Sequence, residues 1–463
     1  MPRITFNSSF YLDNNELSAF RNGNLEIHCL SIRLEKPPSN ENKYLGSGLI
    51  RQTTTNKFEF VMYSKKLTSS TDILDEVFGN NELRPGQLFP KSHYYKLTCI
   101  DEKGRKWISN AILRPNRKAS KNGTLISGYF DEIICHVRLP EKVKKDYLSL
   151  EYSGEYKIPA NISTHINKTI GGKQIAISST LDTLQFTRNK MDFSLRNEDM
   201  HLQTEVRLER KRLPSNFETR ITESLQFVFG YALSWSIMLK QSGKSGEITL
   251  RATSNQKVRG VKPPVSSTRD TEIYFCNLFY SYLAYITPSA STHPISAQIR
   301  SVALANSINV ETLALVLSVA VEGVLRHINT KTVTLSEDEL LSVEDAKKYF
   351  KNWGGSKRIT ARINGLLRSI LENPSAKDVL NELTKERVTT PRHKEAWESL
   401  RNKLAHGGRM GSTPLQEFLD LTNSVLVLFY HLVFYIIGYQ GQYPDYSING
   451  WPERNYPLDK DYV

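Results

Sequence analysis

Alternating apolar and polar positions run through the chain up to about residue 210. In the run 26–32, Ile27, Cys29 and Ser31 fall on one face if the run is a β-strand, because side chains alternate along a strand. Turn-forming residues, such as those at 37–40, separate the runs. Strands are expected at 26–32, 58–63, 94–100, 106–108, 129–137, 148–152 and 201–208. Many short strands with turns between them favour a β-sandwich or a barrel, and we expect a β-sandwich-like region over residues 1–214.

The spacing of apolar residues becomes helical beyond Pro214. Apolar residues recur every three or four positions between 216 and 240, which predicts a helix there. A hairpin is expected around 248–250, and the basic, proline-containing stretch 256–269 is expected to be a linker or exposed loop. Further helices are predicted at 272–286, 295–305, 310–328, 343–353, 359–372, 376–386, 393–406 and 414–439. We therefore expect an α+β chain, in which a helical region over 215–463 contains a bundle core at about 270–440.

One of these helical segments is apolar enough to raise the question of a membrane span. Residues 423–438 read NSVLVLFYHLVFYIIG, which only His431 interrupts, and Glu417 and Asp420 precede them. The stretch is shorter than the roughly 20 apolar residues that a membrane-spanning helix needs. It therefore predicts a buried helix and no membrane partner.

The charge of the chain favours polyanionic partners. Lys and Arg number 61 against 48 Asp and Glu, which gives a formal net charge of +13. Nucleic acid is the first candidate, with an acidic protein or a membrane surface as alternatives. The four cysteines, which form no CxxC pair, predict reduced thiols in a cytoplasmic protein, with no zinc site and no cofactor. They are Cys29, Cys99, Cys135 and Cys276.

An arginine and a histidine separated by four to six residues form the most promising catalytic pattern in the chain. A histidine transfers protons near neutral pH, and an arginine binds phosphate oxygens. The pattern occurs four times, so the spacing alone does not identify a site. The copies are Arg21…His28, Arg196…His201, Arg387…His393 and Arg401…His406.

Sequence context favours the fourth copy. The histidines of the first two copies fall on predicted strands, and Glu198 and Asp199 inside the second would repel a phosphate. Pro391 interrupts the third copy. Only the fourth ends a predicted helix with an apolar stripe, which includes Trp397 and Leu400.

The fourth copy also gathers further polar side chains. Asn402 and His406 are four residues apart and share a helix face, with Arg401 beside them. Lys403 and Arg409 add positive charge, which suits RNA binding. A purely structural role is the alternative, because basic residues suit the C-terminal end of a helix dipole and His406 can bind free carbonyls there.

The Arg401-Asn402…His406 pattern, at the end of a helix in a predicted bundle, resembles the signature of the HEPN superfamily (higher eukaryotes and prokaryotes nucleotide-binding). The ApeA-like HEPN proteins of bacterial antiviral defence look most similar, since they too place a long β-rich region before the helical domain. The apolar segment 313–322 is similar to their upstream helix with an acidic residue, here Glu322. The resemblance covers about residues 270–440.

The resemblance implies a metal-independent endoribonuclease that acts as a homodimer or higher even oligomer, with two signatures facing each other. His406 would act as general base or acid, Arg401 would stabilise charge on the phosphoryl oxygens, and Asn402 would orient His406 or the substrate. Glu322 would be an auxiliary residue, with a polar position at the bundle edge as its alternative. The expected products carry a 2′,3′-cyclic phosphate and a 5′-hydroxyl.

Arg358 and Arg362 are candidates for binding the RNA backbone. They lie four residues apart on a predicted helix and share a face. A solvated helix face is the alternative.

Two functions follow from the sequence. In the first, the chain cleaves tRNA or other cellular RNA in abortive infection, and the β region senses a phage trigger, such as a phage protein. In the second, the chain is a non-catalytic HEPN binding module with a ligand-binding β region, and His406 is a helix cap.

Overall fold

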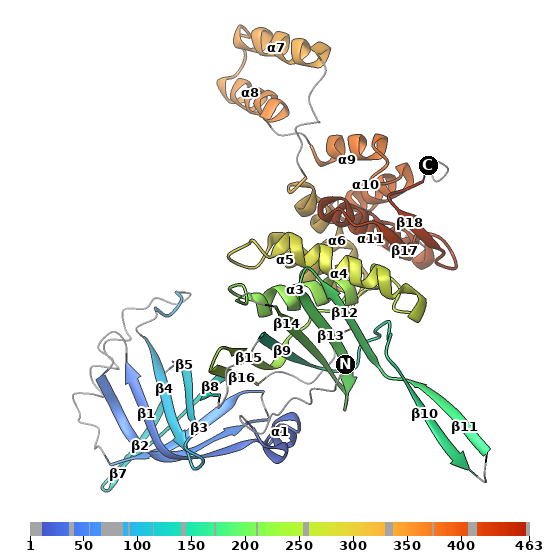
Figure 1. Ribbon diagram of the computed structural model, residues 1–463. Coiled ribbons are helices and arrows are strands. Elements are labelled where there is room, and N and C mark those ends of the chain that lie inside the picture. Colours follow the sequence, from blue (N-terminus) through green and yellow to red (C-terminus); the bar gives the residue numbers. More distant parts are fainter. Residues whose placement is uncertain are drawn as a thin grey trace. The chain divides into compact units, whose positions relative to one another are not determined.

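The structure is a computed structural model that describes residues 12–36, 41–54, 56–65, 87–90, 93–113, 115–139, 145–170, 173–209, 212–252, 259–328, 337–372, 375–405 and 414–459. The turn expected at 37–40 and the first residues of the loop expected at 256–269 lie outside this part. The chain divides into a sheet unit (1–156, 162–218 and 234–257) and a helical unit (157–161, 219–233 and 258–463). This order confirms the expected α+β class, with strands first and helices after them (Figure 1).

Helix α1 (Asn14–Arg21) and a large antiparallel sheet make up the sheet unit. Fourteen strands are hydrogen-bonded in the order β12-β13-β14-β9-β15-β16-β8-β5-β4-β1-β2-β3-β7-β6, and β10 and β11 pair with each other. The strands are β1 (Glu26–Lys36), β2 (Glu41–Gln52), β3 (Phe58–Ser64), β4 (Tyr94–Asp101), β5 (Lys106–Leu113), β6 (Asn116–Ser120), β7 (Gly123–Phe130), β8 (Glu132–Arg138), β9 (Asp146–Ser153), β10 (Ser163–Ile170), β11 (Lys173–Thr180), β12 (Thr183–Arg188), β13 (Met191–Glu198), β14 (His201–Leu208), β15 (Trp235–Ser242) and β16 (Ser245–Arg251). The hydrogen bonding thus runs through one continuous antiparallel sheet, in agreement with the β-rich character expected for this part of the chain.

The face of β1 that is buried changes along the strand. Ile27 and Cys29 are buried as the alternation predicts, but Ser31 is only half-buried and Ile32 is buried instead. The pairing of β1 with β2 shifts register between Cys29 and Ile32, which is the signature of a β-bulge or similar irregularity. An extra residue at that point moves every later side chain to the opposite face. The predicted position of Ser31 was therefore wrong.

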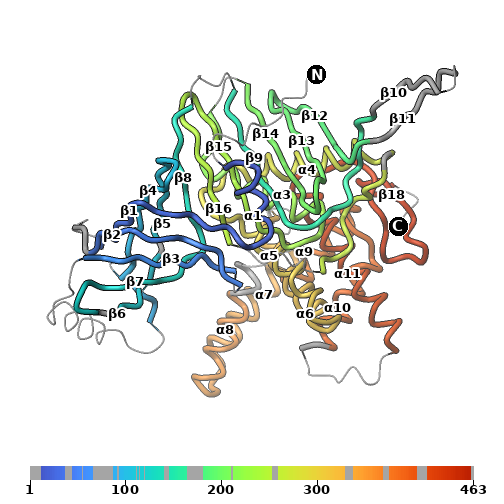
Figure 2. Tube along the Cα trace, turned by 90° about the horizontal axis from the view of Figure 1, so that it is seen from below, coloured from blue at the N-terminus to red at the C-terminus, as the bar shows by residue number. Residues whose placement is uncertain are grey.

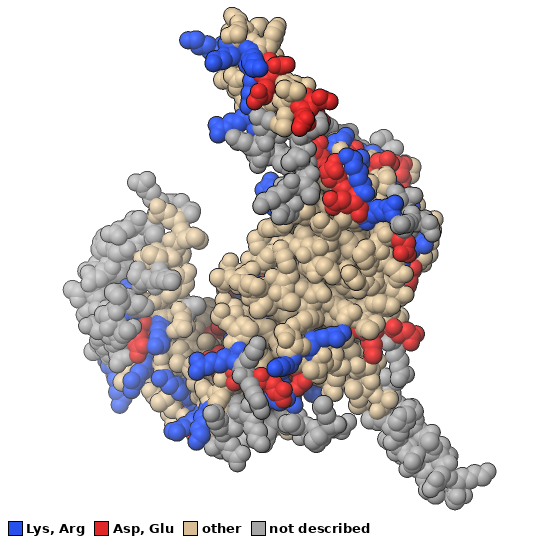
Figure 3. Space-filling model, turned by 45° about the horizontal axis from the view of Figure 1, so that its top comes forward, with Lys and Arg blue, Asp and Glu red and all other residues tan. Residues whose placement is uncertain are grey.

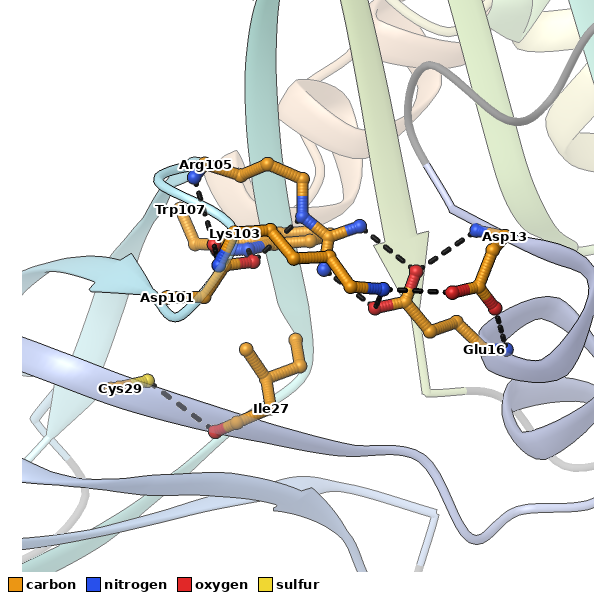
Figure 4. Close-up of polar contacts among 8 residues, drawn as sticks. All are labelled: Asp13, Glu16, Ile27, Cys29, Asp101, Lys103, Arg105 and Trp107. Atoms are coloured by element: carbon orange, nitrogen blue, oxygen red, sulfur yellow. Dashed lines mark hydrogen bonds and ion pairs between the residues drawn. The ribbon is translucent and has the colours of Figure 1, made fainter.

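A buried carboxylate organises the turn between β4 and β5 (Figure 4). The side chain of Asp101 is 1% exposed, and it accepts hydrogen bonds from Arg105 Nε at 2.6 Å and Trp107 Nε1 at 3.0 Å. It also accepts bonds from the backbone N–H groups of Lys103 and Arg105, at 3.0 and 2.8 Å. These donors compensate the cost of burying the charge.

The same turn is bonded to the N-terminus of α1. Glu16 forms a capping box with Asp13, and both carboxylate oxygens of Glu16 accept bonds from the Arg105 guanidinium, at 2.6 and 2.9 Å. Although partial burial opposes it, hydrogen bonds from Arg105 and Lys103 hold the pKa of Glu16 below its usual value. Arg105 thus joins the helix cap to the buried Asp101.

Replacing Asp101 with Asn should lower the free energy of unfolding of the sheet unit by about 3–5 kcal/mol, because it leaves buried donors without a charged acceptor. Denaturant unfolding followed by circular dichroism measures this loss. The matched variant Glu16→Gln changes a less buried carboxylate and should cost less. Equal losses for the two variants would contradict a dominant role for Asp101.

Most helices lie within three residues of their predicted bounds, but the helix predicted at 343–353 begins six residues earlier, at Glu337. Short helix η3 (Arg269–Thr271) and the strand pair β17 (Gly441–Pro444) and β18 (Glu453–Tyr456) accompany them. The helices are α3 (Phe217–Phe229), α4 (Glu272–Ile286), α5 (Pro294–Ala305), α6 (Val310–Leu325), α7 (Glu337–Lys351), α8 (Lys357–Glu372), α9 (Ala376–Lys385), α10 (Pro391–Ala405) and α11 (Leu415–Ile437).

The helix predicted over 216–240 is too long. Helix α3 ends at Phe229, and Gly230 follows with a φ of +71°, a conformation that favours glycine. Residues 235–242 form β15, which pairs with β9 and β16 inside the sheet. Successive residues at the start of β15 are all buried, so its apolar run does not alternate and resembles a helical pattern. Because this hairpin continues the sheet, the division of the chain is not a single cut near residue 214.

Helix α11 forms the centre of the helical unit, in contact with α4, α6 and α10 (Figure 1, Figure 2). It is long and apolar enough to cross a membrane, but 67% of its most apolar stretch is buried within the protein. Val425, Leu428 and Phe434 are fully buried. The segment is thus a buried helix, as predicted.

Two histidines lie in this core, where α10 begins. His431 of α11 is fully buried, and its ring lies 5.2 Å from that of His393, centroid to centroid. His393 Nε2 lies 3.1 Å from Ser447 Oγ, which donates to Asp445 Oδ1 at 2.5 Å. Burial lowers the pKa of His393 to about 4, and burial, with His393 nearby, lowers the pKa of His431 well below its usual value. Both imidazoles are therefore neutral at pH 7.

The helical unit should lose stability as the pH falls from about 6.5 to about 4. Between these pH values the two histidines bind protons in the unfolded chain but stay neutral in the folded chain. The helical unit therefore has its full stability only above about pH 6.5, the pKa of a histidine in the unfolded chain. The loss should be on the order of 3 kcal/mol for His393 alone. Denaturant titrations at several pH values measure it. The variant His431→Phe should show a flatter profile, and an unchanged profile would contradict the assignment.

Candidate active site

Helix α10 carries the favoured Arg…His pattern at its C-terminal end. Pro391 opens the helix, where a proline has no hydrogen bond to lose. Trp397 and Leu400 are buried, with 2% and 0% of their surface exposed, and they hold α10 in the helical unit against α6, α9 and α11. This confirms the predicted apolar stripe at those two positions.

Two contacts fix α10 against α6. Trp397 Nε1 donates a hydrogen bond to the carbonyl oxygen of Ser318 at 3.2 Å. One turn further along both helices, Arg401 Nε donates to Glu322 Oε1 at 2.6 Å. From the first contact to the second, the residue number increases by four in both helices. Helices α6 and α10 therefore run side by side in the same direction.

The Arg401 side chain lies at the surface beside this contact. Its side chain is 52% exposed and that of Glu322 is 32% exposed. The Arg401 guanidinium also lies 5.5 Å from the centre of the Trp397 ring, within the range of a cation–π contact. Among the described residues, its two terminal nitrogens make no hydrogen bond. A guanidinium held at Nε in this way presents its terminal nitrogens to an external anion.

The neighbouring motif residues are placed unequally. The side chain of Asn402 is exposed and makes no hydrogen bond to any residue that the structure describes. Lys403 Nζ lies 3.2 Å from Glu417 Oε1 in the first turn of α11, so Lys403 contacts α11 while Arg401 contacts α6. His406 and Arg409 lie outside the described residues.

Arg358 and Arg362 lie on α8 and are exposed, one turn apart. They share a helix face, as the spacing predicts. Neither makes a hydrogen bond or an ion pair with α10 among the residues that the structure describes. The structure therefore does not join them to the motif.

The histidines of the other three copies of the Arg…His pattern lie on strands or are buried. His28 and His201 lie on β1 and β14, which confirms their prediction as strand residues. His201 Nδ1 lies 2.6 Å from the carbonyl oxygen of Asp199. His393 is buried in the first turn of α10 and bonded to Ser447. The Arg401 copy is thus the one with an exposed helix end.

The sheet unit contains a cleft with basic residues in its wall. Arg21, His201 and Arg251 are among the residues that line it. Arg21 makes two bonds to Glu151, at 2.9 and 2.7 Å, and Arg251 bonds to Glu132 at 2.7 Å. Since carboxylates already hold both guanidinium groups, the cleft does not indicate a ligand class.

Comparisons of the chain with protein-family models, with curated proteins and with solved structures found no match. The site therefore has to be judged on its own geometry. Sequence patterns identified Arg401 and Glu322 separately but not their contact, nor the bond from Trp397 to Ser318. The His393–Ser447–Asp445 chain was also missed, because Asp445 and Ser447 fall in a stretch with no predicted element.

Substituting Glu322 with Gln should change the free energy of unfolding by less than about 1 kcal/mol, because an exposed ion pair contributes little to stability. Trp397→Ala, by contrast, should cost about 3–5 kcal/mol, because it leaves a cavity between α6 and α10. Denaturant unfolding of both variants beside the wild type measures the difference. A large loss for Glu322→Gln would mean that the pair is a structural element.

Proposed function

We propose that this chain is a metal-independent endoribonuclease of the HEPN type, with its active site at the C-terminal end of α10. The observation that carries the proposal is the 2.6 Å contact between Arg401 and Glu322. The resemblance singles out these two residues, 79 positions apart, as part of the signature and as the upstream acidic residue. Their meeting at one exposed helix end supports a common role.

In this proposal Glu322 and Trp397 position the Arg401 guanidinium. Glu322 accepts the hydrogen bond from Arg401 Nε, and the indole ring of Trp397 lies beside the guanidinium group. The terminal nitrogens then bind two oxygens of the scissile phosphate, since their fork matches that geometry. They stabilise the negative charge that builds up on those oxygens during attack.

His406 carries the proton transfers. A histidine takes the proton from the ribose 2′-hydroxyl as its oxygen attacks the adjacent phosphorus, and the bond from phosphorus to the 5′-oxygen breaks. A second histidine, supplied by another copy of the chain in a homodimer, protonates the leaving 5′-oxygen. The products are a 2′,3′-cyclic phosphate and a 5′-hydroxyl, and Asn402 orients His406 or the substrate.

Lys403 contributes to RNA binding when its ammonium group leaves Glu417 and forms an ion pair with a phosphate of the RNA. Both side chains are exposed, so their ion pair costs little to break. The net charge of +13 assists capture of RNA in the cytoplasm. The wider role that we propose is abortive infection, with tRNA or other cellular RNA as substrate and the sheet unit sensing a phage component.

The variant His406→Ala should cut RNA on the order of 10²–10⁴ times more slowly than the wild type, which is the usual contribution of a general acid or base. Total tRNA is incubated with each protein in the presence of EDTA, and the cleaved ends are tested for 2′,3′-cyclic phosphate. His201→Ala is the matched control, since it removes the histidine of another Arg…His copy and should leave cleavage intact.

Because a sensor keeps such an enzyme inactive at rest, growth inhibition on expression is compared for the same three proteins. Equal cleavage and equal toxicity of the wild type and His406→Ala would refute the nuclease. Absence of both effects under phage challenge would favour the binding module instead.

A further inference from the structure

Helices α7 and α8 form a hairpin without a core. None of the described side chains between residues 337 and 368 is buried. The two helices pack on each other, and a short connection at 352–356 makes them antiparallel. Two helices that bury no side chain gain little from packing, and isolated helices of this length are only marginally stable in water. The hairpin therefore needs another surface.

Large apolar side chains are exposed along the whole hairpin. Their exposed fractions range from 38% for Trp353 to 67% for Tyr349. They include residues of both helices: Leu340, Leu341, Tyr349, Trp353, Ile359 and Leu366. Exposed apolar side chains in such number mark an interaction surface.

The charges of the hairpin are separated between its two ends. We call the connected end, residues 346–362, the tip, and the opposite end of α7, residues 337–345, the base. The tip has six basic residues and no acidic one: Lys347, Lys348, Lys351, Lys357, Arg358 and Arg362. The base has five acidic residues and no basic one: Glu337, Asp338, Glu339, Glu344 and Asp345. Figure 3 shows the blue and red side chains at opposite ends of this hairpin.

This separation is unfavourable within a single hairpin. Because the helices are antiparallel, the basic end of α7 lies beside the basic start of α8, and like charges repel. Basic residues at the start of α8 also oppose the helix dipole, which favours negative charge there. Beside the base, the sequence of α8 has one Arg and one Glu, Arg368 and Glu372. Lys348 Nζ lies 3.5 Å from Asp345 Oδ1 where the two ends meet on α7, but the tip still has a net positive charge and the base a net negative one.

We infer that the hairpin pairs with the same hairpin of a second copy of this chain, in antiparallel register about a two-fold axis. In that arrangement each basic tip faces the acidic base of the partner, so both charged ends are compensated at once. The four helices enclose the apolar side chains that a single hairpin exposes. This interface does not depend on the nuclease proposal, because it uses neither α10 nor Glu322.

Charge reversal at each end tests the pairing. One variant reverses the tip to a net negative charge, with Lys347→Glu, Lys348→Glu, Lys351→Glu, Lys357→Glu and Arg358→Glu. The other reverses the base to a net positive charge, with Glu337→Lys, Asp338→Lys, Glu344→Lys and Asp345→Lys. Sedimentation at low salt should show that each full-length variant alone has half the mass of the wild-type assembly, because its tips and bases then carry the same sign.

An equimolar mixture of the two variants should recover the wild-type mass, since a negative tip then meets a positive base and a negative base meets a positive tip. This recovery also shows that both variants are folded. A monomeric wild type, variants of unchanged mass, or a mixture that does not reassociate would each overturn the inference. If the tip instead binds nucleic acid, reversing the tip abolishes binding of total tRNA, and mixing the two variants does not restore the wild-type mass.

Discussion

Burial of Trp397 between α10 and α6 sets the register on which the candidate active site depends. The indole is 2% exposed, and its N–H is satisfied by the carbonyl of Ser318, so the ring has one favourable position. One turn later the helices bring Arg401 to Glu322. A large buried aromatic side chain contributes several kcal/mol, whereas an exposed ion pair contributes about 1 kcal/mol at most. The packing of Trp397 therefore determines where the contact between Arg401 and Glu322 forms.

The groups that stabilise the two units differ in kind from those in the motif. Asp101 is buried and accepts bonds from four donors, and His393 is buried and bonded to Ser447. Arg401 and Asn402 are exposed and have few or no partners among the described residues. Polar residues that serve stability are normally satisfied inside the protein. Exposed polar residues that a rigid helix holds in place are free to meet a ligand.

The sequence predicted the helices well because their apolar residues repeat strongly and their ends carry clear signals. Helix α4 has the predicted bounds, and α11 proved to be a buried helix. The strands were harder. A bulge in β1 shifted the buried face after Cys29, and β15 is buried on successive residues, so its pattern resembled a helix. A bulge and two-sided burial depend on partners distant in the chain, which a local pattern does not contain.

The candidate site was predicted residue by residue but not as a contact. Arg401 and Glu322 each followed from a pattern, while their meeting depends on how α6 packs on α10. A contact between residues that are 79 positions apart cannot be obtained from the spacing within either helix. The same holds for the chain from His393 to Asp445, which joins α10 to the segment after β17.

The structure also changes the interpretation of Arg358 and Arg362. On the sequence they were two basic residues on one helix face, suited to an RNA backbone. In the hairpin they belong to a tip that is basic throughout, beside a base that is acidic throughout. RNA would compensate the tip, but it would be repelled by the base and would leave Leu340 and Leu341 exposed there. A second hairpin compensates both ends and covers the leucines, so self-association accounts for more of what this segment contains.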